Sequence, residues 1–468
     1  MVLLKRRFLA LVNNDIFEGS TKPGMSTNKK TILKNITSLF TIQIANYLLP
    51  MVSVPIISRI IGPDKFGILN NAEAIVGYFI LIVNYGFDLT ATRKVAQNRN
   101  DAEFINELFS TVLWCKVLLF GITLLLFIGC FALFPVFVAE WKVMVYSYII
   151  VISWVITPNW LYQGMQELHR IAIFNVIMKM LFTIAVLLAV RSESDYIYQP
   201  LVFGAVQIAI GYYSFKYAMR RYNIVINIIS FKRVLKVLKD EYLVFFSTIV
   251  INLYTTTNIV LLGALANNAE VGYYTAAIRI VLIAQTVITL PLSNSFFPYV
   301  GAAFSHGRDE GVQAAQKVLP IVTIVGIVAS AGMVLFGPWA LRLFYGEDFA
   351  LSIPIFIILS VTPLLIVISN VYGLLVMVNL IMDKAFLKIT AAGAAVSIIS
   401  NLLLIPTNGG IGAAYSLIIA EAFIVLTCVF YLYNQRINLF TWRYFNIRSI
   451  ITQAQSVFPL LKKSGTNE

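Results

Sequence analysis

Long apolar stretches dominate this chain, and only short polar segments, glycines and prolines interrupt them. A membrane-spanning helix needs about 20 predominantly apolar residues, because the hydrocarbon core of a bilayer is about 30 Å thick. The pattern predicts twelve spanning helices of roughly this length. Their expected ranges are 33–61, 68–92, 108–134, 142–163, 171–190, 198–219, 243–265, 271–298, 318–344, 350–378, 386–405 and 411–433.

The second half of the chain repeats features of the first half. Gly62 ends the first predicted helix and Gly67 begins the second, while Gly263 and Gly272 hold similar positions around the seventh and eighth. Six spans in each half would give both halves the same orientation across the membrane. We therefore expect an all-α, polytopic membrane protein with two parallel six-helix bundles around a central cavity, an architecture typical of transporters. The expected parts are a cytoplasmic N-terminal segment (1–32), an N-terminal bundle (33–220), a cytoplasmic linker (221–242), a C-terminal bundle (243–434) and a cytoplasmic C-terminal tail (435–468).

The composition supports a membrane protein and excludes several soluble classes. Of the 468 residues, 59% are hydrophobic and 12% charged, whereas about 25% are charged in an average soluble domain. The 3 cysteines lie far apart inside apolar stretches, and neither of the 2 histidines has metal-ligand spacing. Since no glycine-rich loop is followed by Lys-Ser or Lys-Thr, a P-loop is excluded. We expect no metal, no cofactor and no enzymatic activity.

The excess of positive charge indicates the orientation of the chain. There are 35 lysines and arginines against 22 acidic residues, which on a soluble protein would point to nucleic acid. Here most of the basic residues lie in the two terminal segments and in every second loop. The positive-inside rule therefore predicts that both termini are cytoplasmic, and we expect no nucleic-acid partner. The opposite face carries only Lys65, Lys142, Arg191 and Arg342.

Four sequence runs resemble a known family of membrane proteins. They are RIIGPDKFGILNNAEAIVGYF (59–79), NYGFDLTATRKVAQNR (84–99), AEVGYYTAAIRIV (269–281) and NLLLIPTNGGIGAAYSLIIAE (401–421). These runs are similar to polysaccharide flippases of the Wzx type, which belong to the multidrug/oligosaccharidyl-lipid/polysaccharide exporter superfamily. The resemblance implies a bacterial inner-membrane protein that moves an undecaprenyl-pyrophosphate-linked oligosaccharide, such as an O-antigen or capsule repeat unit, to the outer leaflet.

The same resemblance bears on partners and on the start of the chain. Expected partners are the lipid-linked oligosaccharide, membrane lipids, a polysaccharide polymerase and a chain-length regulator. The segment Ser-Thr-Asn-Lys-Lys after Met25 is similar to the short basic beginning of the family. Residues 1–24 are therefore expected to be an upstream start artefact or a disordered tail.

Cations inside predicted spans are the candidates for binding a pyrophosphate. Lys179 lies near the middle of the fifth span and Lys116 in the third, so both could line one cationic site in the N-terminal half. An exposed cation at the bilayer centre costs about 2.5–3.5 kcal/mol on insertion scales, which argues for a cavity or a partner. Arg279 in the eighth span and Arg59 near the outer end of the first complete the set. Snorkelling, a structural ion pair and interfacial anchoring are the alternatives.

Three acidic residues are candidates for gating or coupling. Glu73 lies at a depth similar to that of Arg279, so we expect an ion pair that closes the outer mouth until substrate phosphates compete for the arginine. Asp88 lies beside basic residues at the cytoplasmic mouth, where a local structural pair is the alternative to a proton or substrate site. Glu421, near the centre of the twelfth span, could carry a coupling proton because burial disfavours a charged carboxylate, or it could hydrogen-bond within the bundle.

A polar run in the seventh predicted span is poorly suited to lipid. Polar side chains within a span favour a water-lined cavity, and aromatic rings can stack on sugars. We therefore expect sugar contacts from Asn252, Tyr254, Thr256 and Asn258.

Two other functions stay open at this point. A multidrug antiporter of the same superfamily would share the fold, although cationic cavity residues disfavour organic cations as substrates. A membrane polysaccharide polymerase or glycosyltransferase would need catalytic residues on a substantial loop, and the loops here are short.

Overall fold

The described part of the chain is made of helices joined by turns and short irregular connections. A computed structural model describes residues 50–291 and 296–446, and these contain helices and no β-strand. The expected all-α, polytopic fold is therefore confirmed for these residues. Residues 1–49, including Met25 and most of the first predicted span, lie outside the described residues, as do 292–295 and 447–468.

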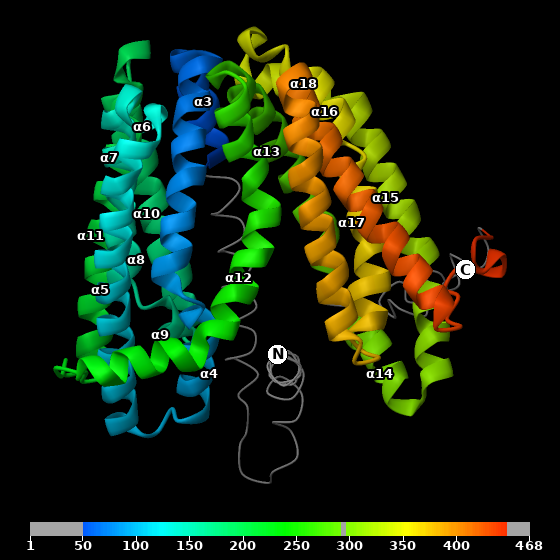
Figure 1. The fold of residues 1–468 in the computed structure, drawn as a ribbon, viewed down its shortest axis with the longest axis horizontal. Coiled ribbons are helices and arrows are strands. Elements are labelled where there is room, and N and C mark those ends of the chain that lie inside the picture. Colours follow the sequence, from blue (N-terminus) through cyan, green and yellow to red (C-terminus); the bar gives the residue numbers. More distant parts are fainter. Residues whose placement is uncertain (1–49, 292–295, 447–468) are drawn as a thin grey trace, which may run out of the picture.

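The helices form two groups that follow each other along the chain (Figure 1). The N-terminal group contains α3 (Pro50–Asn84), α4 (Phe87–Gln97), α5 (Ala102–Leu133), α6 (Pro135–Ala139), α7 (Trp141–Tyr148), α8 (Ile150–Ile156), α9 (Asn159–Gly164), α10 (Leu168–Ala189), η2 (Glu193–Ile197) and α11 (Tyr198–Arg221). The C-terminal group contains α12 (Phe231–Leu265), α13 (Asn268–Pro291), α14 (Phe297–His306), α15 (Arg308–Tyr345), η4 (Glu347–Phe349), α16 (Ser352–Leu359), α17 (Thr362–Asn370), the π-helix η5 (Val371–Met377), α18 (Asp383–Asn434) and η6 (Trp442–Tyr444).

Seven helical runs in the described residues are long and apolar enough to span a membrane. Two of them contain a kink at a single glycine, where sequence patterning predicted a loop of several residues. Gly62 in α3 has φ 72° and Gly409 in α18 has φ 52°, values that glycine adopts without steric cost. The number of twelve spans stays a prediction. The seven runs are Ser53–Gln97, Ala102–Leu133, Trp141–Gly164, Leu168–Ala189, Arg308–Tyr345, Ser352–Met377 and Asp383–Asn434.

The segment expected as a linker (221–242) is partly helical. Helix α12 begins at Phe231, twelve residues before the predicted start of the seventh span at residue 243. Val234, Val237, Leu238 and Glu241 recur at helical spacing and turn toward the N-terminal group, where Val234 and Glu241 are buried. The prediction of a linker rested on the basic residues of this segment. The helical spacing of its inward-facing residues was not taken into account.

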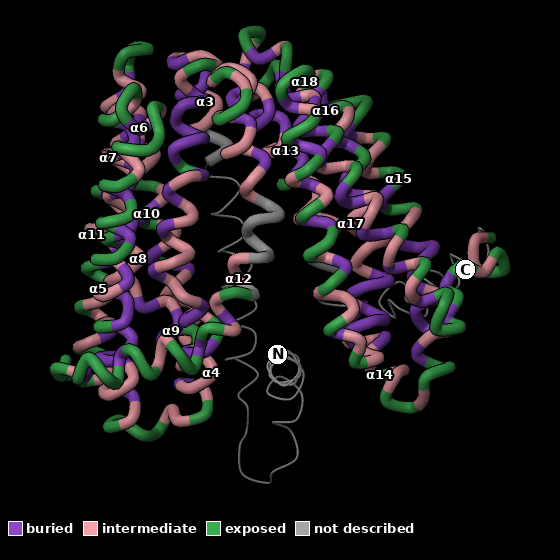
Figure 2. Tube along the Cα trace, viewed as in Figure 1, coloured by how far each residue is buried: buried purple, intermediate pink, exposed green. Residues whose placement is uncertain are grey.

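The two helix groups meet along α3 and α13 and diverge toward the end that carries α4 and α14 (Figure 1). A Cβ atom on Gly67 would lie 1.7 Å from the carbonyl oxygen of Asn268, and one on Gly272 would lie 2.1 Å from that of Pro63. Figure 2 shows buried residues where these helices meet. The absence of side chains at both glycines therefore allows the two backbones to touch.

This contact predicts a large effect from one added methyl group. We expect Gly67→Ala to lower the free energy of unfolding by about 1–3 kcal/mol, because the methyl group has to push α13 away. The control is Gly77→Ala on the same helix, where an added Cβ meets nothing within 4 Å and alanine favours the helix. Thermal unfolding of the purified protein, followed by tryptophan fluorescence, measures both variants. Equal melting temperatures for the two variants would contradict the close contact.

Candidate functional site

An ion pair joins the two helix groups where α3 and α13 meet. Arg279 Nη2 lies 3.0 Å from Glu73 Oε2 and donates a hydrogen bond of 2.5 Å to Asn70 Oδ1. The guanidinium carbon lies 5.6 Å from the centre of the Phe66 ring, a distance at which cation–π attraction operates. The ion pair expected between Glu73 and Arg279 is thus present, and its role in gating stays a prediction.

The spacing along α3 explains how this helix holds the arginine. Phe66, Asn70 and Glu73 follow one another at i, i+4 and i+7, which places them on one helix face. Asn70 Nδ2 donates to the Phe66 carbonyl oxygen at 2.6 Å, and this bond turns Asn70 Oδ1 toward Arg279. The sequence analysis missed Phe66 and Asn70, although their spacing from Glu73 was visible.

Lys179 on α10 adds a second cation to this site. It is half-buried, and Glu73 and Arg279 both act on it electrostatically. The side chains of Arg279, Lys179, Glu73 and Asn70 will be called the Arg279 cluster. With two cations and one carboxylate, the cluster has an excess of positive charge.

Arg59 ties the end of the first helical segment of α3 to the C-terminal group. Its Nη2 donates to the carbonyl oxygens of Arg342, at 3.4 Å, and Leu343. Both carbonyls belong to the last turn of α15, where the helix dipole favours a cation, and the Arg342 carbonyl oxygen also accepts a hydrogen bond of 3.0 Å from Gly346 N. In this conformation Arg59 therefore binds a helix end, and the expected substrate contact stays a prediction.

Lys116 is buried within the N-terminal group, and its expected place beside Lys179 in one cationic site stays a prediction. The residue is only 2% exposed, and its Nζ donates to the Trp154 carbonyl oxygen at 3.0 Å. Pro158 lies four residues after Trp154 and has no N–H, so this carbonyl loses its usual helical donor. Lys116 thus stabilises a proline break inside the N-terminal group.

The polar run of α12 makes helix–helix contacts at Asn258. This residue is 2% exposed, and its Oδ1 accepts hydrogen bonds from Asn401 at 2.7 Å and Ser397 at 3.2 Å, both on α18. Asn258 therefore fixes α12 against α18 in this conformation, and its expected sugar contact stays a prediction. Thr256 is half-buried. The side chains of Asn252 and Tyr254 lie outside the described residues.

Asp88 and Glu421 occupy separate elements. Asp88 lies in the first turn of α4, where its Oδ2 accepts a hydrogen bond of 2.5 Å from Asn84. Glu421 is buried in α18 with 5% exposure. Their proposed roles in coupling stay predictions. Within the described residues no group of three or more His, Cys, Asp or Glu side chains is arranged to hold a metal ion.

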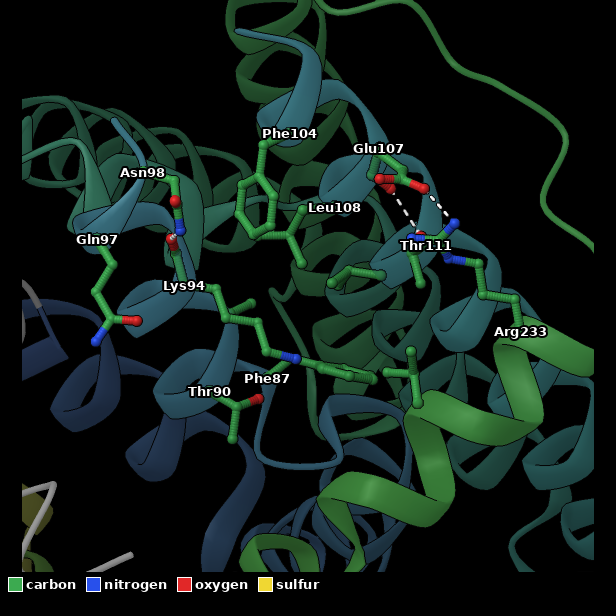
Figure 3. Close-up of a pocket in the computed structure, with 13 residues that line it drawn as sticks. Phe87, Thr90, Lys94, Gln97, Asn98, Phe104, Glu107, Leu108, Thr111 and Arg233 are labelled. Carbon is green, nitrogen blue, oxygen red and sulfur yellow. Dashed lines mark hydrogen bonds and ion pairs between the residues drawn. The ribbon is translucent and has the colours of Figure 1, made fainter. Parts of the chain in front are cut away.

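A cavity of about 300 Å³ lies between α4, α5 and α12 (Figure 3). Lys94, Glu107 and Arg233 are among its polar walls, and Glu107 forms an ion pair with Arg233. Lys94 Nζ lies 2.7 Å from Glu241 Oε1. This cavity was not predicted from the sequence, because its walls come from segments that are distant along the chain.

The fold defines a class of polytopic, all-helical membrane protein. A solved structure of the lipid II flippase MurJ, in an inward closed conformation, has a similar fold. The superposition covers 94% of this chain and 92% of that one, with a TM-score of 0.62 and 15% sequence identity. An inward-facing multidrug resistance MATE family transporter of the MOP superfamily gives a TM-score of 0.63 and 14% identity, covering 99% of this chain and 100% of that one. At these identities the likeness concerns the fold.

The sequence family is also defined. A family model described as polysaccharide biosynthesis protein matches residues 32–304, which is more than half of the 468 residues. The chain therefore belongs to that family, and the resemblance found in the sequence is confirmed. A protein of Escherichia coli (strain K12) that is named for O-antigen transport is 27% identical over 414 residues, covering 88% of this chain and 99% of that protein.

The position of Lys116 predicts a role in stability. We expect Lys116→Met to lower the free energy of unfolding by about 1–3 kcal/mol, because the buried Trp154 carbonyl loses its donor. The control is Lys216→Met at an exposed lysine, for which a change within about 0.5 kcal/mol is expected. Chemical unfolding of the purified variants measures both. Unchanged stability of Lys116→Met would show that the hydrogen bond to Trp154 is dispensable.

Proposed function

We propose that this protein is a flippase for undecaprenyl-pyrophosphate-linked oligosaccharide repeat units of O-antigen or capsule type. It moves them from the cytoplasmic to the periplasmic leaflet of a bacterial inner membrane by alternating access. The polysaccharide biosynthesis family, the relative named for O-antigen transport and the fold shared with a lipid II flippase support this function. The Arg279 cluster is the observation that carries it, because its excess positive charge suits a pyrophosphate.

The proposed orientation places both termini and the end carrying α4 and α14 in the cytoplasm, following the positive-inside rule. The contact of α3 with α13 then closes the periplasmic side, and the two helix groups act as parallel bundles (33–220 and 243–434). A polysaccharide polymerase and a chain-length regulator are the proposed partners downstream. No chemical reaction is part of this function.

The proposed mechanism is a competition for Arg279. In the closed state Glu73 and Asn70 hold the guanidinium across the interface between α3 and α13. A pyrophosphate that enters from the cytoplasmic side offers Arg279 and Lys179 a stronger polyanionic partner than one carboxylate. Release of Glu73 removes a tie between the helix groups, so substrate binding favours opening on the periplasmic side.

The membrane potential can drive this movement. With the cytoplasm negative, outward transfer of an anion is favoured by about 2.3 kcal/mol per charge per 100 mV, so two uncompensated charges gain about 5 kcal/mol. A proton or sodium counterflow through Glu421 or Asp88 is the alternative drive.

Two other functions are less well supported. Antiport of organic cations would place a positively charged substrate beside Arg279 and Lys179, which repel it. A polymerase or glycosyltransferase would need a catalytic constellation, and the charged groups of the Arg279 cluster are instead paired across a helix interface.

Gene deletion tests the function directly. We expect the deletion strain to lose its surface polysaccharide and to accumulate the lipid-linked repeat unit in the cytoplasmic leaflet, because the carrier no longer crosses. Lipid extraction with mass spectrometry, combined with an oxidant that reaches only periplasmic sugars, measures both quantities. Normal surface polysaccharide with altered drug sensitivity would refute the proposal and favour a multidrug transporter.

Charge reversal tests the competition mechanism. We expect Glu73→Arg and Arg279→Glu each to reduce transport about 10–150-fold, as expected for the loss of a charged hydrogen bond worth about 1.5–3 kcal/mol. The double variant re-forms the pair and recovers part of this loss. Translocation of lipid-linked oligosaccharide in reconstituted vesicles provides the measurement.

The matched control for charge reversal is the neighbouring pair of Asp64 and Lys65. Their side chains are 3.2 Å apart just after the kink of α3 at Gly62, and both are accessible to solvent. Reversal of this pair should leave transport unchanged. A double variant of Glu73 and Arg279 that is no more active than either single variant would contradict the competition mechanism.

A further inference from the structure

The first part of α12 lies across the helices of the N-terminal group (Figure 1). Residues 231–242 will be called the linker helix, because they follow the connection between the two groups. The linker helix runs steeply inclined to the spanning helices, near the end that carries α4. Its orientation is that of a helix lying along a membrane surface.

The inner face of the linker helix is fastened to the N-terminal group. Glu241 is paired with Lys94 at 2.7 Å. Arg233 is paired with Glu107, as Figure 3 shows. Tyr85 Oη donates a hydrogen bond of 3.0 Å to the carbonyl oxygen of Leu238. Contacts on three different turns hold the helix in a fixed rotation about its axis, so its outer face has a defined direction.

The outer face of the linker helix carries an apolar stripe bordered by lysines. Phe231, Leu235 and Tyr242 are 62%, 46% and 46% exposed, and their spacing of four and seven residues places them on one side. Beside this stripe three exposed lysines follow at intervals of four and three residues: Lys232, Lys236 and Lys239. A helix with exposed aromatic and aliphatic side chains next to lysines is typical of binding at a membrane interface.

A tryptophan on α5 indicates that the linker helix lies at the level of the lipid headgroups. Trp114 is 37% exposed, and its Nε1 donates a hydrogen bond of 3.1 Å to the carbonyl oxygen of Asn227, just before the linker helix. Exposed tryptophans with a bonded N–H concentrate at the level of lipid headgroups. The beginning of the linker segment therefore lies where lipid phosphates are found.

We propose that the linker helix is a binding surface for anionic phospholipid headgroups. Lys232, Lys236 and Lys239 contact the phosphates, and Phe231, Leu235 and Tyr242 enter the boundary with the acyl chains. This inference rests on the membrane placement in the proposed function, with the linker helix at the cytoplasmic leaflet, whose anionic lipids attract basic helices. The N-terminal group is thereby attached to the leaflet, while the C-terminal group is free to move against it.

Lipid retention by the full-length protein tests the inference. The probes are phosphatidylglycerol and phosphatidylcholine, offered to the detergent-purified protein, and native mass spectrometry counts the bound lipids. We expect Lys236→Gln with Lys239→Gln to weaken phosphatidylglycerol binding about 30-fold, from about fivefold per lysine near an anionic surface. Phosphatidylcholine binding should not change, and added salt should weaken the wild-type interaction with phosphatidylglycerol.

The matched control removes two exposed lysines from another helix. Lys384 and Lys388 lie in the first turns of α18, and their double substitution by glutamine removes the same charge. We expect at least tenfold less effect from this control on phosphatidylglycerol binding. Equal effects of the two double variants would overturn the inference, because they would indicate a general response to net charge.

Two further outcomes bear on the inference. Unchanged phosphatidylglycerol binding by the Lys236/Lys239 variant would overturn it, and if the wild type also self-associates and the variant does not, the surface is a contact with a second copy of the chain. Circular dichroism should show wild-type helix content for both variants, since all four lysines are exposed. If the protein does not bind phosphatidylglycerol but still moves lipid-linked oligosaccharide in vesicles, the inference is overturned and the proposed transport function is unaffected.

Discussion

The contact of the Arg279 guanidinium with α3 of the other helix group is the interaction on which the closed end of the protein depends. An arginine within a membrane span is costly unless it has partners, about 2.5–3.5 kcal/mol on insertion scales. Glu73, Asn70 and the Phe66 ring provide these partners, and all three come from α3 of the opposite group. The need to satisfy one cation therefore holds the two groups in register.

That interaction requires the two helices to approach closely, and two glycines make this possible. Gly67 and Gly272 allow the backbones of α3 and α13 to touch, so the short side chain of Asn70 can reach Arg279. The contact leaves little room for intermediate separations, because packed interfaces are either formed or broken. In the proposed mechanism, a competitor for Arg279 therefore acts on a two-state contact.

The sequence predicted a contact that follows from the charges of two side chains and their depth in the membrane. It did not predict contacts that depend on a backbone carbonyl or on a helix far along the chain. Glu73 and Arg279 were paired correctly, since two opposite charges at one depth in membrane spans need each other. The bond from Lys116 to the Trp154 carbonyl was not predicted, because it depends on Pro158, which leaves that carbonyl without its helical donor. Asn258 was assigned to sugar because its partners on α18, Ser397 and Asn401, are about 140 residues away.

Helix α12 contacts both helix groups and therefore connects the closed end to the linker helix. Its linker helix is fastened to the N-terminal group through Glu241, and its other end touches α3 where Gly263 packs against Asn71. Asn258 fixes the same helix to α18 of the C-terminal group. If the two groups separate at the closed end, the contact at Gly263 breaks while the linker helix stays attached. Helix α12 must then bend between Glu241 and Asn258. A lipid bound to the linker helix would keep that part of α12 in place while the rest of the helix moves.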